Sequence, residues 1–139
     1  DIYYELEGTS DIKAYKTIDI DINPNSFPNS INIGSKGVVP VAILTTPTFD
    51  VKDVNINSVT FAGAKPVKSN LEDIDKDGDL DLILHFDTQS LNLKPTDTQA
   101  ILLGDNIKGT DSVKILQNNK KTSFLRNITA TIHEFLFEE

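Results

Sequence analysis

The stretch DIDKDGDLDLILHF (residues 73–86) joins an acidic loop to an alternating apolar segment, and it decides how the chain folds. Aspartate occupies every odd position of the loop, and Gly78 stands at position 6, where a sharp turn needs a residue that tolerates positive φ. After the loop, Leu82, Leu84 and Phe86 recur with a period of two, as in a strand with one buried face. The segment therefore predicts a tight loop that leads into a core strand.

The spacing of the loop carboxylates predicts a calcium site. Ca²⁺ takes roughly six to eight oxygen ligands, which alternating aspartates on a tightly curled backbone supply from one side. Position 12 holds Leu84 instead of the Glu of an EF-hand, and the exit from the loop is typical of a strand, not of a helix. A structural Ca²⁺ between two strands is therefore expected. Its predicted ligands are Asp73, Asp75, Asp77, Asp79 and Asp81.

Charge supports a cation in this loop. Residues 73–81 contain five Asp and one Lys, a local charge of −4 out of the chain's −8. Carboxylates held this close raise one another's pKa values and push the loop open unless a cation neutralises them. The alternative is a solvated acidic turn without an ion.

Two segments that precede the loop also have the patterns of strands. Ile18, Ile20 and Ile22 alternate with acidic residues, and residues 38–46 indicate a more fully buried strand in which Pro40 implies an edge position or a bulge. Short turn motifs separate these runs, and a single helical turn is predicted at residues 51–54, with Asp50 as its cap. We expect an all-β fold, an antiparallel β-sandwich of the immunoglobulin-like or jelly-roll-like kind with the calcium loop between strands.

Composition limits the function classes. The chain has 139 residues, enough for one domain, and its only arginine is Arg126. A net charge of −8 argues against nucleic-acid binding, because phosphate backbones would be repelled. Cys is absent, so disulfides and thiolate metal sites are excluded, and the sequence predicts no transmembrane segment. The chain does not begin with Met, which favours a mature secreted protein cut from a precursor, or a fragment.

Four motifs resemble a domain that recurs in secreted and surface proteins of archaea and bacteria. They are DIDINPNSFPNSIN (19–32), KGVVPVAILTT (36–46), EDIDKDGDLDLILHFDT (72–88) and GTDSV (109–113), and the resemblance covers roughly residues 17–117. It implies an extracellular β-sandwich module with a calcium loop, usually attached to larger proteins, with no catalytic activity to carry over. The loop alone is also similar to the loops of dockerins and of integrin propeller blades.

The two ends of the chain lie outside this resemblance. We expect an N-terminal extension (1–16), a calcium-binding β-sandwich core (17–117) and a C-terminal strand extension (118–139). In the N-terminal extension, alternate residues would lie on the same face of a strand. This segment is therefore either a candidate donor strand for a neighbouring molecule or an edge strand of its own domain. The candidate strand-donor residues are Ile2, Tyr4 and Leu6.

Other candidate sites are weaker. Asp19 and Asp21 lie two apart on the polar face of a strand, where they form either a second metal site or a solvated face. Asn127 begins the sequon Asn-Ile-Thr, a candidate for glycosylation if the protein is secreted. His85 and His133 lie in alternating segments with no acid or nucleophile clearly linked to them, so no catalytic dyad is predicted.

Two function classes follow. The first is a non-catalytic, secreted, calcium-stabilised β-sandwich with a structural or adhesive role at a cell surface. It would associate with itself or with other surface proteins, and in the sharper form it is a filament subunit built by strand complementation. The second is a carbohydrate- or ligand-binding module of a larger secreted protein. Trp is absent and every Tyr lies near the N-terminus, so few aromatic side chains are present to stack on a sugar. This is a modest argument against glycan binding.

Overall fold

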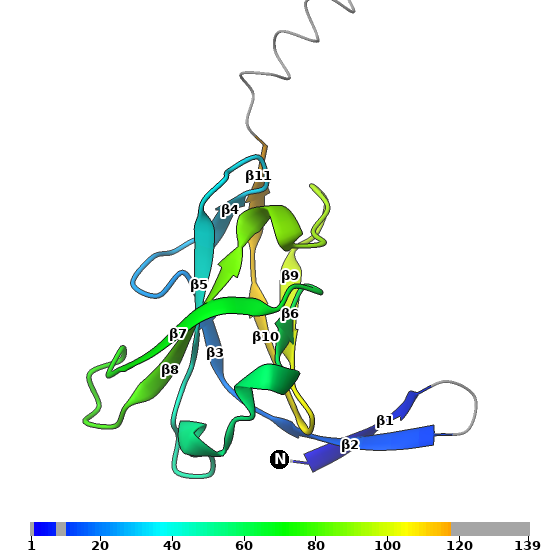
Figure 1. The fold of residues 1–139 in the computed structure, drawn as a ribbon, viewed down its shortest axis with the longest axis vertical. Helices are drawn as coiled ribbons and strands as arrows, with labels where there is room; N and C mark the ends of the chain where they lie inside the picture. Colours follow the sequence, from blue (N-terminus) through cyan, green and yellow to red (C-terminus); the bar gives the residue numbers. More distant parts are fainter. Residues whose placement is uncertain (1, 8–10, 118–139) are drawn as a thin grey trace, which may run out of the picture.

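The computed structural model describes residues 2–7 and 11–117, and in this part of the chain the predicted all-β sandwich is confirmed (Figure 1). The strands are β1 (Ile2–Glu7), β2 (Asp11–Thr17), β3 (Ile20–Ile22), β4 (Ser30–Asn32), β5 (Val38–Ile43), β6 (Thr60–Phe61), β7 (Pro66–Glu72), β8 (Asp81–Asp87), β9 (Gln99–Leu103), β10 (Ile107–Ser112) and β11 (Lys114–Leu116). Three single 3₁₀ turns accompany them: η1 (Val51–Asp53), η2 (Ile56–Ser58) and η3 (Thr88–Ser90). None of the helical segments described is long and apolar enough to span a membrane.

Two main sheets face each other. One has the strand order β3-β5-β8-β7, and the other has the order β1-β2-β10-β9-β6. Most pairs are antiparallel, as expected, but β2 pairs with β10 and β4 with β11 in parallel. The predicted helical turn is confirmed as η1, where the Asp50 side chain accepts a hydrogen bond of 2.9 Å from the backbone N–H of Lys52.

The alternating residues predicted for the core fill the space between the sheets. Leu82, Leu84 and Phe86 of β8 are buried, as are the isoleucines that run through β3. The rings of Phe61 and Phe86 come from opposite sheets, and their centroids lie 5.2 Å apart. These contacts between layers provide most of the apolar burial that stabilises a domain of this size.

β5 is an inner strand, so an edge position for it was the wrong expectation. Pro40 is tolerated because its neighbour β3 pairs with β5 only from Val41 onward. The Pro40 carbonyl accepts a hydrogen bond from the N–H of Asn23, just past the end of β3. In a strand the N–H and C=O of one residue point to the same side, so the donor that proline lacks would face the end of β3, where no ladder bond is lost.

The chain crosses from one sheet to the other between β2 and β3, and Gly109 of β10 makes room for this crossing. A Cβ atom at Gly109 would lie 2.6 Å from Cγ2 of Ile20 and 3.2 Å from Cγ1 of Ile18. Only a residue without a side chain allows β10 to approach so closely. This contact brings Asp111, two residues further along β10, beside β3.

β1 and β2 form an antiparallel hairpin, here called the arm (Ile2–Glu7 and Asp11–Thr17), which projects from the body of the domain (Figure 1). The arm joins the body through two parallel residue pairs, Lys16 with Ile107 and Thr17 with Lys108. Lys108 also forms an ion pair of 2.5 Å with Glu5. Ile2, Tyr4 and Leu6 thus lie in a strand that pairs within its own chain, which is the edge-strand alternative, and a donor role for them stays a prediction.

The predicted C-terminal extension (118–139) lies outside the described residues, and Asn127 and His133 lie in it. The last described strand, β11, ends at Leu116. In Figure 1, β11 lies at the opposite end of the body from the arm.

Candidate metal centre

The acidic loop connects β7 to β8, as its sequence predicted. Two residues in the loop adopt left-handed backbone conformations, Lys76 with φ of 61° and Gly78 with φ of 96°. A left-handed residue reverses the chain sharply, and glycine does so without a steric penalty. The loop therefore curls tightly enough to turn several of its side chains inward.

Three of the five predicted ligands come together in space. Carboxylate oxygens of Asp73, Asp75 and Asp81 all lie within 4.8 Å of one another. Asp77 and Asp79 are exposed and are not part of this group. One cation could be held by the three clustered carboxylates, whereas ligation by Asp77 and Asp79 stays a prediction.

Asp81 anchors this cluster to the body of the domain. Its side chain is completely buried at the first position of β8. Its Oδ1 accepts a hydrogen bond of 2.9 Å from the N–H of Thr45, and its Oδ2 accepts one of 2.9 Å from the N–H of Ile74. Asp81 thus ties the loop to the segment that follows β5, and each of its oxygens keeps a lone pair for another ligand.

Asp73 is held by the backbone of its own loop. Its two carboxylate oxygens accept hydrogen bonds from the N–H groups of Asp77, at 3.1 Å, and Gly78, at 2.9 Å. Desolvation alone would raise the pKa of Asp73, but these hydrogen bonds outweigh it, so its pKa lies below the usual value. The backbone of the loop therefore favours the charged form of Asp73.

Asp75 behaves in the opposite way. Partial desolvation, the adjacent side chain of Asp77 and the charge of Asp81 raise the pKa of Asp75 to about 6. Part of this rise is repulsion between the negative charges of Asp75 and Asp81. The donor set of hard oxygens, the concave loop and this repulsion all fit a divalent metal ion.

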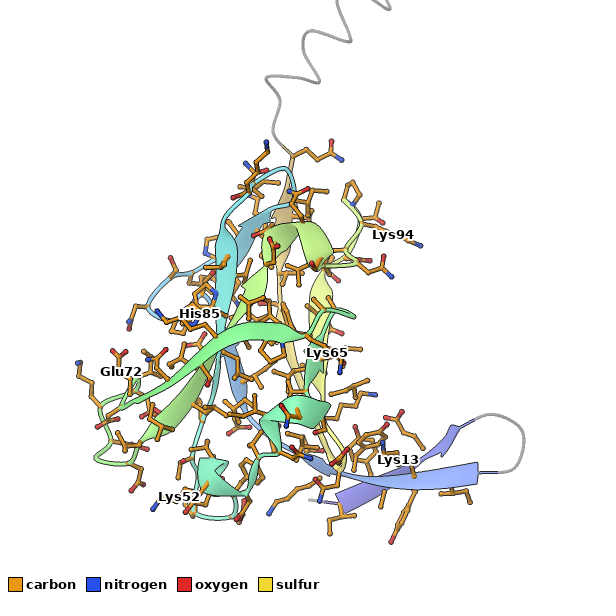
Figure 2. All side chains as sticks on the ribbon, viewed as in Figure 1. Lys13, Lys52, Lys65, Glu72, His85 and Lys94 are labelled. Atoms are coloured by element: carbon orange, nitrogen blue, oxygen red, sulfur yellow. The ribbon has the colours of Figure 1, made fainter. Side chains whose placement is uncertain are left out.

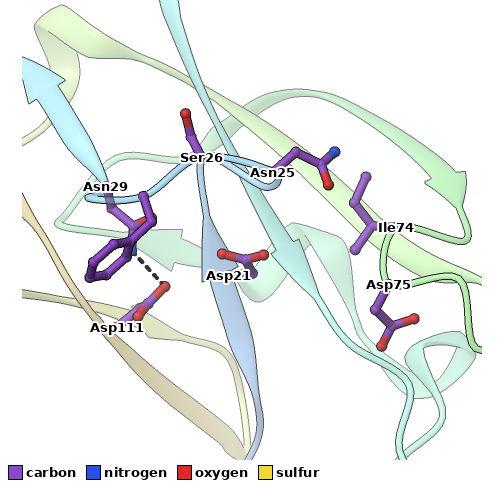
Figure 3. A pocket seen from close by; sticks show the side chains of 8 residues that line it. Asp21, Asn25, Ser26, Asn29, Ile74, Asp75 and Asp111 are labelled. Atoms are coloured by element: carbon purple, nitrogen blue, oxygen red, sulfur yellow. Dashed lines mark hydrogen bonds between the residues drawn. The ribbon is translucent and has the colours of Figure 1, made fainter.

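A second acidic feature lies next to the loop. Asp21 of β3 and Asp111 of β10 line an open cleft of about 500 Å³, whose walls also include Asn25, Asn29 and Asp75 (Figure 3). Asp111 is well partnered, because its Oδ2 accepts hydrogen bonds of 3.0 Å from the N–H of Ile22 and from the Asn29 side chain. Partial burial and the charge of Asp111 raise the pKa of Asp21 above its usual value.

Asp19 and Asp21, the predicted pair, line different hollows of the surface. Asp21 faces the cleft just described, whereas Asp19 lines separate hollows near the base of the arm, with Thr17 and Ile18. Asp21 instead lies beside Asp111, a residue from a distant part of the sequence. A second metal site at Asp19 and Asp21 stays a prediction.

The histidine that the structure describes lies within the four-stranded sheet. His85 is in β8, opposite Pro40 of β5 and Lys68 of β7, and its Nδ1 is buried without a hydrogen-bond partner among the described residues (Figure 2).

Sequence reasoning missed three contributors to this region. Thr45 donates to Asp81 and, through its hydroxyl, to the carbonyl of Leu80 at 2.7 Å. Asp111 and Phe27 line the cleft, and the Phe27 side chain is 86% exposed. All three residues lie within the motifs that carry the family resemblance, and this was the only sign in the sequence that they could belong to a site. A single sequence does not show that these motifs lie side by side in the fold.

No family model, no curated protein and no solved structure matches this chain.

Proposed function

We propose that this protein is a non-catalytic, calcium-stabilised β-sandwich module with a structural or adhesive role in an extracellular assembly. The observation that carries the proposal is the cluster of Asp73, Asp75 and Asp81, in which a fully buried carboxylate joins two loop carboxylates. Its location on a surface loop between the edge strand β7 and the core strand β8 supports a structural use for the ion, because binding there would fix the β7–β8 connection.

Calcium is the ion that the donor chemistry favours. The cluster offers carboxylate oxygens on an irregular loop, and the larger, more tolerant coordination sphere of Ca²⁺ suits such a loop better than the strict octahedron of Mg²⁺. The proposed extracellular location would be consistent with this choice, because calcium sites of modest affinity are typical of extracellular modules. Extracellular location and adhesion are themselves part of the proposal, which the family resemblance supports.

The test is a calcium titration of the metal-free full chain, in which calorimetry measures binding and thermal unfolding measures stability. We expect Ca²⁺ to bind and to raise the melting temperature, with Mg²⁺ far less effective at equal concentration. At a calcium concentration about 100 times the Kd, binding stabilises the folded state by about 2.7 kcal/mol.

Two variants make this test specific. Asp75→Asn removes one negative charge from the cluster and should weaken calcium binding, while the replacement keeps the size of this exposed side chain. Asp53→Asn is the matched control, since it removes one exposed carboxylate from η1, outside the loop. Equal calcium affinity of the two variants, or no binding by the unaltered chain at millimolar Ca²⁺, would overturn the proposal.

Carbohydrate binding is the second candidate, and the cleft beside the loop favours it. The exposed ring of Phe27 lines this cleft together with carboxylates and the amides of Asn25 and Asn29. An exposed aromatic face next to hydrogen-bonding groups suits the apolar and polar sides of a sugar ring.

A glycan-binding screen of the full chain with Ca²⁺ present separates the two candidates. Retention of one class of glycan, lost in Phe27→Ala, would favour the ligand-binding module. A screen without any retained glycan would leave the structural role as the function.

A further inference from the structure

β1 is an edge strand with a free side. In the sheet order β1-β2-β10-β9-β6 it pairs with β2 over all six of its residues, and no other strand of the described chain borders it. Its outward N–H and C=O groups form an open template for another strand. The arm carries this template away from the body, where a second molecule can approach it (Figure 1).

One face of the arm is apolar and exposed. Ile2 and Tyr4 of β1 and Ile12 of β2 have exposed fractions of 67%, 70% and 69%. The register pairs Tyr4 with Ala14, which is exposed as well, and Ile2 with Lys16, so these residues share one face, which is apolar apart from Lys16. The opposite face is the one packed inward, where Tyr15 is buried and stacks on Tyr3 with ring centroids 5.9 Å apart.

Charge favours a second copy of this chain as the occupant of the free edge. The chain as a whole carries −8, and four of these negative charges lie in the acidic loop, so two copies repel each other less where such charge is sparse. The arm is nearly neutral, with three acids against two lysines, a net charge of −1. These charged residues are Glu5, Glu7, Asp11, Lys13 and Lys16.

Of the antiparallel registers that keep the apolar faces of two β1 strands on the same side, the register centred on Tyr4 pairs the most residues without opposing like charges. Centred on Tyr4, the register sets Tyr4 opposite Tyr4, Ile2 opposite Leu6 and Tyr3 opposite Glu5 of the second copy, so no like charges meet between residues 2 and 6. A register centred on Glu5 would oppose two carboxylates. A shift by one residue would set the apolar face of one copy beside the polar face of the other.

We propose that two copies of this chain associate through their arms, with β1 pairing antiparallel to β1 of the second copy in the register centred on Tyr4. The product is a four-stranded sheet, β2-β1-β1-β2, around a two-fold axis. Such an interface uses the same surface on both copies and closes on itself, so it gives a dimer and not a filament. A single pair of short strands is a small interface, so the Kd is expected in roughly the micromolar to millimolar range.

Disulfide trapping tests this arrangement, because the native chain has no cysteine. Residues directly opposite each other in antiparallel strands have Cα atoms about 4.5–5.5 Å apart, within the range that a disulfide spans. In full-length Tyr4→Cys, mild oxidation should therefore yield a covalent dimer about tenfold faster than in a variant whose cysteine meets its copy only by collision.

Two control variants place a cysteine at similar exposure elsewhere. Val67→Cys, at a position 63% exposed, lies on the edge strand β7 of the other sheet. Ile12→Cys lies on the same apolar face as Tyr4, but on β2, away from the two-fold axis. Both should crosslink only at the slow collisional rate. If Ile12→Cys forms a dimer as fast as Tyr4→Cys, the arms pack face to face and the edge pairing is overturned.

Sedimentation equilibrium of the unaltered chain provides the second measurement. A dimer fraction that rises with protein concentration, and that Tyr4→Lys abolishes, supports the pairing. A chain that stays monomeric up to millimolar concentration, or that grows into open-ended polymers, overturns it. The biological purpose of this dimer rests on the proposed structural role, but the pairing itself does not. The calcium titration can fail while the arms still pair, so failure of the proposed function and failure of this inference are distinguishable.

Discussion

At the scale of single residues, Asp81 has a double role that its position in a calcium motif does not reveal. It is the ninth residue of the acidic loop, and its carboxylate also accepts two backbone hydrogen bonds in a fully buried position. A buried N–H that loses its acceptor costs about 1–3 kcal/mol. Asp81 should therefore stabilise the fold even when no metal is bound.

Replacing Asp81 by alanine tests this structural contribution. We expect Asp81→Ala to lower the free energy of unfolding of the metal-free protein by roughly 2–5 kcal/mol, because the N–H groups of Thr45 and Ile74 both lose their acceptor. Urea denaturation of metal-depleted protein measures the change. Asp79→Ala, at an exposed loop position, is the control and should change stability by less than about 0.5 kcal/mol. Equal stability of the two variants would show that Asp81 matters only for metal binding.

Asp75 makes the loop sensitive to pH. Its pKa of about 6 in the folded, metal-free protein exceeds the usual value, so the folded state binds its proton more tightly than the unfolded state does. This group therefore makes the metal-free protein less stable as pH rises from about 4 to about 6. A cation that neutralises the cluster removes this penalty, so the stabilisation by Ca²⁺ should be small near pH 5 and larger at pH 7.

The difference in melting temperature between calcium-loaded and resin-depleted protein, measured from pH 4.5 to pH 7.5, checks this expectation. In Asp75→Asn, the fall in metal-free stability between about pH 4 and pH 6 should be reduced. A calcium-induced shift of equal size at pH 5 and pH 7 would contradict it.

At the scale of elements, the periodicity of the sequence predicted where strands occur, but it did not predict which strands lie side by side. The alternation of apolar residues located β3, β5 and β8, and the capping aspartate located η1, because these features depend on residues close in sequence. The contact of Asp111 with the N–H of Ile22 joins positions 89 residues apart, and it depends on which strands lie side by side. Likewise, the loop spacing predicted Asp73, Asp75 and Asp81, whereas Thr45 comes from the segment that follows β5, 36 residues before Asp81.

Gly109 offers a test of how closely β10 must approach β3. A methyl group there would lie 2.6 Å from Cγ2 of Ile20 and 3.2 Å from the carbonyl oxygen of Ile18, so the two strands would have to move apart. Gly109→Ala should lower the free energy of unfolding by about 1–3 kcal/mol, as overpacking in a core does. Gly37→Ala is the control, because its added methyl group meets only Ser35 Oγ, at 3.4 Å. Equal unfolding midpoints in urea would contradict this account of the crossing.

At the scale of the whole molecule, the arm and β11 lie at opposite ends of the body (Figure 1). No pattern in the sequence predicted this separation, because it arises from the two parallel pairs, β2 with β10 and β4 with β11, and parallel pairing depends on contacts distant in sequence. The core expected from residue 17 to residue 117 stays a prediction; in the structure β2 ends at Thr17 and β11 at Leu116.

This arrangement has a mechanical consequence. Tension between residue 2 and residue 117 would first reach the arm, whose start and end lie side by side at Ile2 and Lys16, so its hydrogen bonds would open one after another, as in a zipper. The parallel pairs behind it would be pulled along their length, so their bonds would share the load. In an optical-tweezers experiment we expect an early, low-force lengthening of about 50 Å from the arm, followed by one abrupt rupture of the body. A single step without the early lengthening would contradict this expectation. A two-step response would mean that the arm extends under low force while the body stays intact until a higher force.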